Sequence, residues 1–328
     1  MKRLLLLCFA ATAAFGAGSP ATPMIEIVSA TDTSVTYREL QPTRVALDPA
    51  GGVFHYKGCP LITAKMQWAS PAAGTLHKLT PHAACAKNAG PEYATKTEKR
   101  IPRDPNHIAV LYLGNSLVYY NEVPGITSAL GKNEKRSLRV DSVTRSGVSL
   151  KQLWETTPAL KKLWLEHWDY VVLQGGGGGV GPVNRAEEFN TYLAKFNEQV
   201  RNSGAEPLFY MVWRQRLPNH NEASIESARR LKMRIAPVGV AWDDLVSTKR
   251  FERLDQDGVH PDARGAYLVA VTVYSTIYNK PAFGAPHDFA YLAASGEVYD
   301  DALREQTINE TQARFIQDAA WRAVQKVR

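Results

Sequence analysis

From His107 onward the sequence alternates between short, mainly apolar runs and longer amphipathic segments. Runs that are apolar at every position indicate strands buried on both faces, as in a parallel sheet covered by helices. The expected strands are 108–113, 138–144, 170–173, 208–213 and 238–241, and the expected helices are 123–132, 149–164, 185–202, 222–235 and 263–278. Pro158 should break or kink the second of these helices. The pattern predicts an α/β fold for residues 107–328, a three-layer α/β/α sandwich around a central parallel sheet.

Residues 1–19 have the layout of a secretory signal peptide, with Lys2 and Arg3 before an apolar stretch and small residues after it. The apolar stretch is shorter than the roughly 20 residues that span a bilayer. We therefore expect cleavage and export, to the periplasm or outside the cell, without later membrane insertion. Removing this segment takes away two positive charges, so the formal net charge falls from +7 to +5. The remaining charges are scattered, which favours an ordinary solvated surface and no nucleic-acid partner.

Residues 20–100 have a different sequence pattern from the rest of the chain, because short extended pieces are separated there by glycine and proline. They predict a small β-rich region, joined to the main domain by a charged linker over 96–106. After signal removal the chain keeps two cysteines, Cys59 and Cys85, and an even number in an exported protein favours one disulfide. With His55 and His82 they form the alternative, a zinc site. The disulfide is the preferred interpretation, and no metal or cofactor is expected.

Two short strings supply the side chains of a hydroxyl nucleophile system. The string Gly114-Asn115-Ser116 follows the first apolar run, and the string Asp257-Gly258-Val259-His260-Pro261 comes much later. A serine is a weak nucleophile until a base takes its proton, and a carboxylate can hold the histidine base in the correct tautomer. The non-catalytic alternatives are that Ser116 caps a helix and that the second string forms a polar surface turn. Finding both strings in one chain favours catalysis by Ser116, His260 and Asp257.

These two strings resemble the SGNH (GDSL-type) hydrolase family, in its branch that writes the first block as Gly-Asn-Ser. The resemblance covers roughly residues 108–283 and implies a flavodoxin-like α/β/α fold. It also implies an oxyanion hole made by the backbone N–H of Ser116, by Gly147 after the second strand, and by a side chain after the third. The family usually has asparagine at that third position, whereas this chain has Gln174 followed by five glycines. Asn115, in place of the usual aspartate, and Asn121 are expected to support the nucleophile loop.

The resemblance implies a serine carboxylic ester hydrolase that works through an acyl-serine intermediate. Export and the Gln174-Gly175 pair favour a small-molecule or glycan ester as substrate, with O-acetyl groups removed from a carbohydrate. Two alternatives remain open: an O-acyltransferase with the same triad, and a non-catalytic glycan-binding protein on a hydrolase scaffold. The glycine run is not a phosphate-binding loop, because no Gly-Lys-Ser/Thr follows it.

Overall fold

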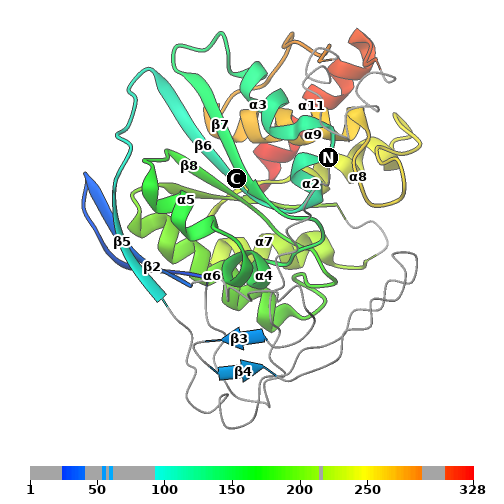
Figure 1. Ribbon diagram of the computed structural model, residues 1–328. Helices are drawn as coiled ribbons and strands as arrows, with labels where there is room; N and C mark the ends of the chain where they lie inside the picture. Colours follow the sequence, from blue (N-terminus) through cyan, green and yellow to red (C-terminus); the bar gives the residue numbers. More distant parts are fainter. Residues whose placement is uncertain (1–23, 41–53, 57–58, 62–92, 214–216, 290–306) are drawn as a thin grey trace, which may run out of the picture. The chain divides into compact units, whose positions relative to one another are not determined.

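The computed structural model describes residues 24–40, 54–56, 59–61, 93–213, 217–289 and 307–328 (Figure 1). The chain divides into two compact units, of which the larger holds residues 23–37 and 97–328. In the smaller unit, strands β3 (Phe54–Tyr56) and β4 (Cys59–Leu61) pair as an antiparallel hairpin. The predicted signal peptide, Cys85 and His82 lie outside the described residues, so the disulfide and the zinc alternative stay predictions.

The larger unit contains a five-stranded sheet in the order β10-β9-β8-β6-β7, and every neighbouring pair is parallel. Its strands are β6 (His107–Gly114), β7 (Ser137–Thr144), β8 (Tyr170–Gln174), β9 (Glu206–Tyr210) and β10 (Arg234–Ala236). The chain leaves β6 for β7 on one side and then continues to β8, β9 and β10 on the other. In chain order this is the 2-1-3-4-5 arrangement of flavodoxin-like folds, with a switch point beside the first strand. The predicted fold class is confirmed.

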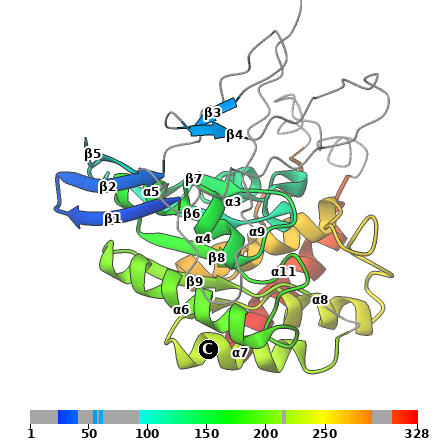
Figure 2. The ribbon, with the colours of Figure 1, turned by 60° about the horizontal axis from the view of Figure 1, so that its bottom comes forward.

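Helices cover both faces of this sheet, because alternate residues of each buried strand point to opposite sides (Figures 1 and 2). Val110 and Tyr112 of β6 join one buried cluster, whereas Leu111 and Leu113 join the other. The first cluster includes residues of α3 (Val123–Leu130), α8 (Val238–Ser247), α9 (Ala263–Tyr278) and α11 (Glu310–Val327). The second includes residues of α4 (Leu150–Thr156), α5 (Ala159–Leu165), α6 (Ala186–Asn202) and α7 (His220–Arg230).

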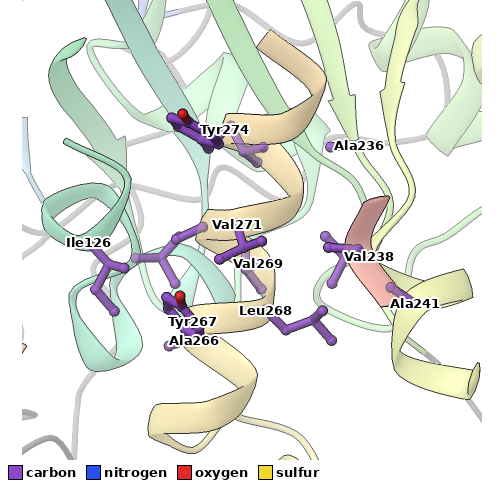
Figure 3. Packing of buried hydrophobic residues seen from close by; sticks show 14 of the residues in the cluster. Ile126, Ala236, Val238, Ala241, Ala266, Tyr267, Leu268, Val269, Val271 and Tyr274 are labelled. Atoms are coloured by element: carbon purple, nitrogen blue, oxygen red, sulfur yellow. The ribbon is translucent and has the colours of Figure 1, made fainter. Parts of the chain in front are cut away.

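Helix α9 is the centre of the first cluster, and all its residues except Arg264 and Tyr278 are buried. Figure 3 shows its side chains between Ile126 of α3 on one side and Val238 of α8 on the other. Asp262 caps the helix, because its Oδ1 accepts a hydrogen bond from the Gly265 N–H at 2.9 Å. The residue just before this cap is Pro261, so the helix fixes the loop that carries His260.

The structure corrects the expected fifth strand. Residues 238–241 begin helix α8, and the fifth strand is β10, which starts four residues earlier. Helix α7 ends at Arg230, and Lys232 adopts a left-handed conformation (φ 53°) that turns the chain into β10. Pro237 then stands at the start of α8, where its fixed φ and missing N–H are tolerated. The other expected strands and helices are present, but the helix expected over 222–235 ends at Arg230 and the strand expected over 208–213 ends at Tyr210. Thr157 and Pro158 separate α4 from α5 as predicted.

Residues 23–37, which precede the expected boundary at about residue 100, belong to the larger unit. Strands β1 (Ile25–Ala30), β2 (Ser34–Leu40) and β5 (Tyr93–Lys99) form a three-stranded sheet. Ile25, Val35 and Tyr37 of this sheet are buried in the second hydrophobic cluster of the larger unit. Apolar contact therefore joins residues 24–37 to the sandwich, although 69 residues separate Tyr37 from the start of β6. No helix among the described residues is long and apolar enough to cross a membrane.

Gly265→Ala should destabilise the protein, even though alanine is the better helix former. A Cβ at this position would overlap Leu254 O and lie 2.9 Å from the Trp242 ring and 3.0 Å from Pro261 Cβ. Overpacking of this kind costs about 1–3 kcal/mol, more than the roughly 1 kcal/mol that the helix gains. Urea unfolding measures the difference. Gly181→Ala is the control, because a Cβ there meets no atom within 4 Å. A Gly265→Ala protein as stable as the control contradicts the prediction.

Candidate active site

Three loops meet at the carboxyl edge of the sheet, after β6, β7 and β8. Because these strands are neighbours and parallel, their ends lie at one edge, where α/β folds place their ligands. The loop after β6 passes directly into a short helix, α2 (Ser116–Tyr119), followed by a 3-10 turn, η1 (Tyr120–Glu122). Ser116 is the first residue of α2, and its side chain lies at this edge.

Asn115 holds the three loops together with its buried backbone and side-chain groups. Its N–H donates to Gln174 Oε1 at 2.9 Å, which ties it to the end of β8. Its Nδ2 donates to Val148 O and to Gly176 O, both at 3.0 Å. Its Oδ1 accepts from the Leu117 N–H at 3.1 Å and caps α2. The amide thus uses both kinds of polar atom, and a carboxylate could not donate to the two carbonyl groups.

The structure brings Ser116, His260 and Asp257 into one hydrogen-bonded chain. His260 Nε2 lies 3.0 Å from Ser116 Oγ, and His260 Nδ1 lies 2.7 Å from Asp257 Oδ2. Ser116 is 6% exposed, whereas the side chain of Asp257 is 48% exposed. The three residues are 144 positions apart at most, and the short loop before α9 delivers the last two.

The ionisation of Asp257 fixes the tautomer of the histidine. Partial burial opposes its negative charge, but hydrogen bonds from the His260 side chain and from the N–H groups of His260 and Val259 outweigh this and lower the pKa of Asp257 to about 2. An ionised carboxylate only accepts hydrogen bonds, so Nδ1 carries the proton and Nε2 is left to accept from the serine hydroxyl. This is the arrangement that a general base requires.

Two backbone N–H groups predicted for the oxyanion hole are available at this edge. Within the described residues, neither the Ser116 N–H nor the Gly147 N–H has a hydrogen-bond acceptor. Gly147 adopts a left-handed conformation (φ 65°) in the turn closed by Val148 N–H and Arg145 O. A side chain would be strained at that φ, so glycine is required for this turn.

The third predicted donor, Gln174, is used elsewhere. Its Nε2 donates to Gly175 O at 3.2 Å and Gly176 O at 2.7 Å, and its Oε1 accepts from Asn115. Gln174 as a whole is 2% exposed. A buried amide that is fully used by backbone groups cannot also donate to an oxyanion. The geometry therefore corrects the prediction, and Gln174 supports the nucleophile loop from the end of β8.

Asn121 connects the nucleophile segment to the histidine loop. Its Nδ2 donates to Pro261 O at 2.7 Å, across 140 positions of sequence. Beside it, the ring of Tyr120 stacks on the imidazole of His260, with 3.9 Å between ring centroids and 13° between planes. No sequence pattern singles out Tyr120, and its position next to Asn121 is the only signal. The described residues contain no group of three or more metal-ligating side chains.

Comparison with solved structures supports the fold. No family model and no curated protein matches the sequence. A DUF4886 family protein from Bacteroides uniformis matches 67% of this chain and 95% of its own, at 18% identity and a TM-score of 0.50. Other solved structures similar to this chain include SGNH-type hydrolases. One from Slackia heliotrinireducens matches 52% of this chain and 99% of its own (25% identity, TM-score 0.45). An acetyl xylan esterase from Geobacillus stearothermophilus matches 52% of this chain and 94% of its own, at 15% identity and a TM-score of 0.40.

Asn115→Asp should destabilise the protein, although aspartate is the ordinary residue of the Gly-Asp-Ser block. The introduced carboxylate would face the carbonyl oxygens of Val148 and Gly176 in a buried place. Losing both donors and burying a charge costs on the order of 3 kcal/mol. Urea unfolding at pH 7 and pH 5 measures the free energy of unfolding of the variant and of wild type. Burial raises the pKa of such a group, so the destabilisation should shrink as the pH falls. Stability equal to wild type at pH 7 would show that the amide donors are dispensable.

Asp257→Asn should change how stability depends on pH. The pKa of Asp257 in the folded protein is about 2, below its ordinary value of 3.8, so its ionisation favours folding above that ordinary value. This contribution is lost as the pH falls from about 4 towards 2, and asparagine does not titrate. The difference in unfolding temperature between wild type and variant should therefore be largest above pH 5. It should be small, because the carboxylate is half exposed. Thermal unfolding between pH 3 and 7 tests this, and a constant difference contradicts it.

Proposed function

We propose that this chain is an exported serine esterase that removes short acyl groups, O-acetyl groups above all, from a carbohydrate. The observation that carries the proposal is the hydrogen-bonded chain from Ser116 through His260 to Asp257 at the carboxyl edge of the sheet. A serine hydroxyl, an imidazole in the correct tautomer and an ionised carboxylate are the parts that nucleophilic acyl transfer needs.

In the first half-reaction, Ser116 Oγ attacks the ester carbonyl carbon while His260 Nε2 takes the hydroxyl proton. The carbonyl oxygen becomes negative, and the N–H groups of Ser116 and Gly147 stabilise it. Asp257 stabilises the imidazolium through Nδ1 and keeps its own charge. The intermediate then collapses: the bond to the leaving oxygen breaks, His260 gives its proton to that oxygen, and the alcohol leaves. An acyl group remains on Ser116.

In the second half-reaction, water replaces the alcohol. His260 Nε2 takes a proton from the water as its oxygen attacks the acyl carbon, and the same two N–H groups stabilise the new oxyanion. Collapse breaks the bond to Ser116 Oγ, which receives the proton from His260. The carboxylic acid leaves, and the enzyme regains its starting state. A sugar hydroxyl in place of water would give acyl transfer with the same residues.

Several features support a short acyl group on a polar carrier. The signal-like residues 1–19 favour an extracytoplasmic substrate. The residues before Gly147 in its loop, Arg145 and Ser146, are exposed and polar, and the carboxylate of Asp257 is half exposed. A surface of this kind suits a hydrated carbohydrate better than a long acyl chain, which needs extensive apolar contact.

Ser116→Ala should abolish ester hydrolysis and leave the fold intact. Without the hydroxyl no acyl-enzyme forms, so kcat for 4-nitrophenyl acetate should fall by roughly 10⁴-fold or more. The variant should also fail to react with a fluorophosphonate probe, which needs an activated serine. Ser247→Ala is the matched control, because within the described part of the chain this hydroxyl bonds to Asp244 O at the end of α8. Near wild-type turnover by Ser116→Ala would end the proposal.

The substrate class is tested separately on the wild-type protein. We expect acetyl esters to be cleaved faster than octanoyl esters, and acetate to be released from acetylated oligosaccharides. Faster cleavage of the long chains would favour a lipid substrate. Transfer of acetyl groups to an added sugar in preference to water would favour the acyltransferase. Wild-type protein that binds glycans but neither labels nor hydrolyses would be a non-catalytic binding protein.

A further inference from the structure

We propose that Tyr120 is a positioning residue that clamps the imidazole of His260 through all steps of the reaction. The inference rests on the proposed function and extends it to a residue outside the triad and the oxyanion hole. Its basis is the face-to-face contact of the two rings, 3.9 Å apart at 13°, and the place of Tyr120 directly after the nucleophile helix.

The histidine loop needs such a clamp because it is exposed. Val259 is 46% exposed, and Gly258 adopts a left-handed conformation (φ 88°). Backbone hydrogen bonds hold the loop at its ends, from Gln256 N–H to His260 O and from Asp262 N–H to Leu254 O. None of these bonds restrains rotation of the imidazole about its side-chain torsions.

Two hydrogen bonds do restrain the imidazole, but one of them is lost during the reaction. Nδ1 bonds to Asp257, and Nε2 bonds to the hydroxyl of Ser116. Once the serine is acylated, its oxygen no longer offers a proton to Nε2. The ring must nevertheless keep Nε2 directed at the acyl carbon, where the water attacks. A parallel aromatic surface blocks rotation out of that plane whether or not the serine bond exists.

The stacked ring also interacts with the positive charge that develops on His260 during the reaction. His260 becomes a cation in each transition state, and the face of a tyrosine ring attracts cations. The contact is therefore stronger in the transition state than in the resting enzyme, which is the condition for an effect on kcat. The phenol oxygen plays no part in either contribution.

Local backbone structure places the ring. The Tyr120 N–H donates to Ser116 O at the end of α2, and its extended conformation (ψ 130°) then turns the chain out of the helix. The next residue, Asn121, donates from Nδ2 to Pro261 O. Consecutive residues thus hold the His260 side chain and the backbone that follows it, and both are attached to the segment that carries the nucleophile.

The test compares Tyr120→Phe and Tyr120→Leu with wild type. Phenylalanine keeps the aromatic face, so its kcat for 4-nitrophenyl acetate should stay within about threefold of wild type. Leucine removes the face, so kcat should fall roughly tenfold or more with little change in KM. The rate of fluorophosphonate labelling should fall in parallel. Tyr278→Leu is the control, because it removes a half-buried tyrosine ring that packs on Tyr274, away from His260.

A spectroscopic measurement separates positioning from general loss of structure. In protein with ¹³C-labelled histidine, the ring current of Tyr120 should shift the imidazole C–H signals of His260 upfield. Tyr120→Phe should keep this shift, and Tyr120→Leu should lose it while the other histidine signals stay in place.

Three results would overturn the inference: wild-type kcat in Tyr120→Leu, equal loss in both variants, or a loss confined to KM. Equal loss would assign the role to the hydroxyl, and a KM effect would make Tyr120 a substrate contact. Wild-type protein that shows neither hydrolysis nor labelling would instead contradict the proposed function, and this inference with it.

Discussion

The side-chain amide of Asn115 is the interaction on which the rest of the site depends. It is buried, and its donors and acceptor bind groups from the loops after β7 and β8 and from helix α2. Gly177 must lack a side chain for this contact, because a Cβ there would overlap both Asn115 Nδ2 and Val148 O. Residue 115, just before Ser116, is therefore asparagine because two carbonyl oxygens face its side chain. Only a side chain with hydrogen-bond donors satisfies both oxygens.

The same requirement explains why Gln174 and the glycine run accompany one another. When β8 ends, its following carbonyl groups turn inward, and Gln174 Nε2 and Asn115 Nδ2 both donate to Gly176 O. A carbonyl oxygen has two lone pairs, so one oxygen can accept from two amides. Left-handed conformations at Gly176, Gly178 and Gly179 let the chain make this inward turn, which few other residues adopt. The glycines serve the internal hydrogen bonds of the nucleophile loop.

Much of the sandwich was predictable, because the central strands β6 and β8 are almost wholly apolar and each helix has its own periodicity. The hydrogen-bonded group of Ser116, His260 and Asp257 was predictable too, since the proposed chemistry needs particular side chains in short strings. The strand predicted over 238–241 was wrong, because the buried start of a helix and a buried strand are equally apolar over four residues. Helix α11 was not among the expected helices. Its capping box, formed by Asn309 and Gln312, is a sequence signal that could have predicted it. The role of Gln174 depends on which carbonyl groups lie near it in space, and no local pattern contains that information.

The segment from Asn115 to Glu122 shows how a rigid interior can control an exposed base. Asn121 and Glu122 both adopt left-handed conformations, with φ of 53° and 54°. Asparagine tolerates this conformation, but a glutamate pays roughly 1–2 kcal/mol for it. Two consecutive left-handed residues turn the chain from α2 into α3 so that Tyr120 meets His260 and Asn121 meets Pro261. A relaxed turn would direct those groups elsewhere. Contacts to the histidine loop therefore stabilise the strained turn at Asn121 and Glu122. The turn persists because α3 and α9 are packed together in the core.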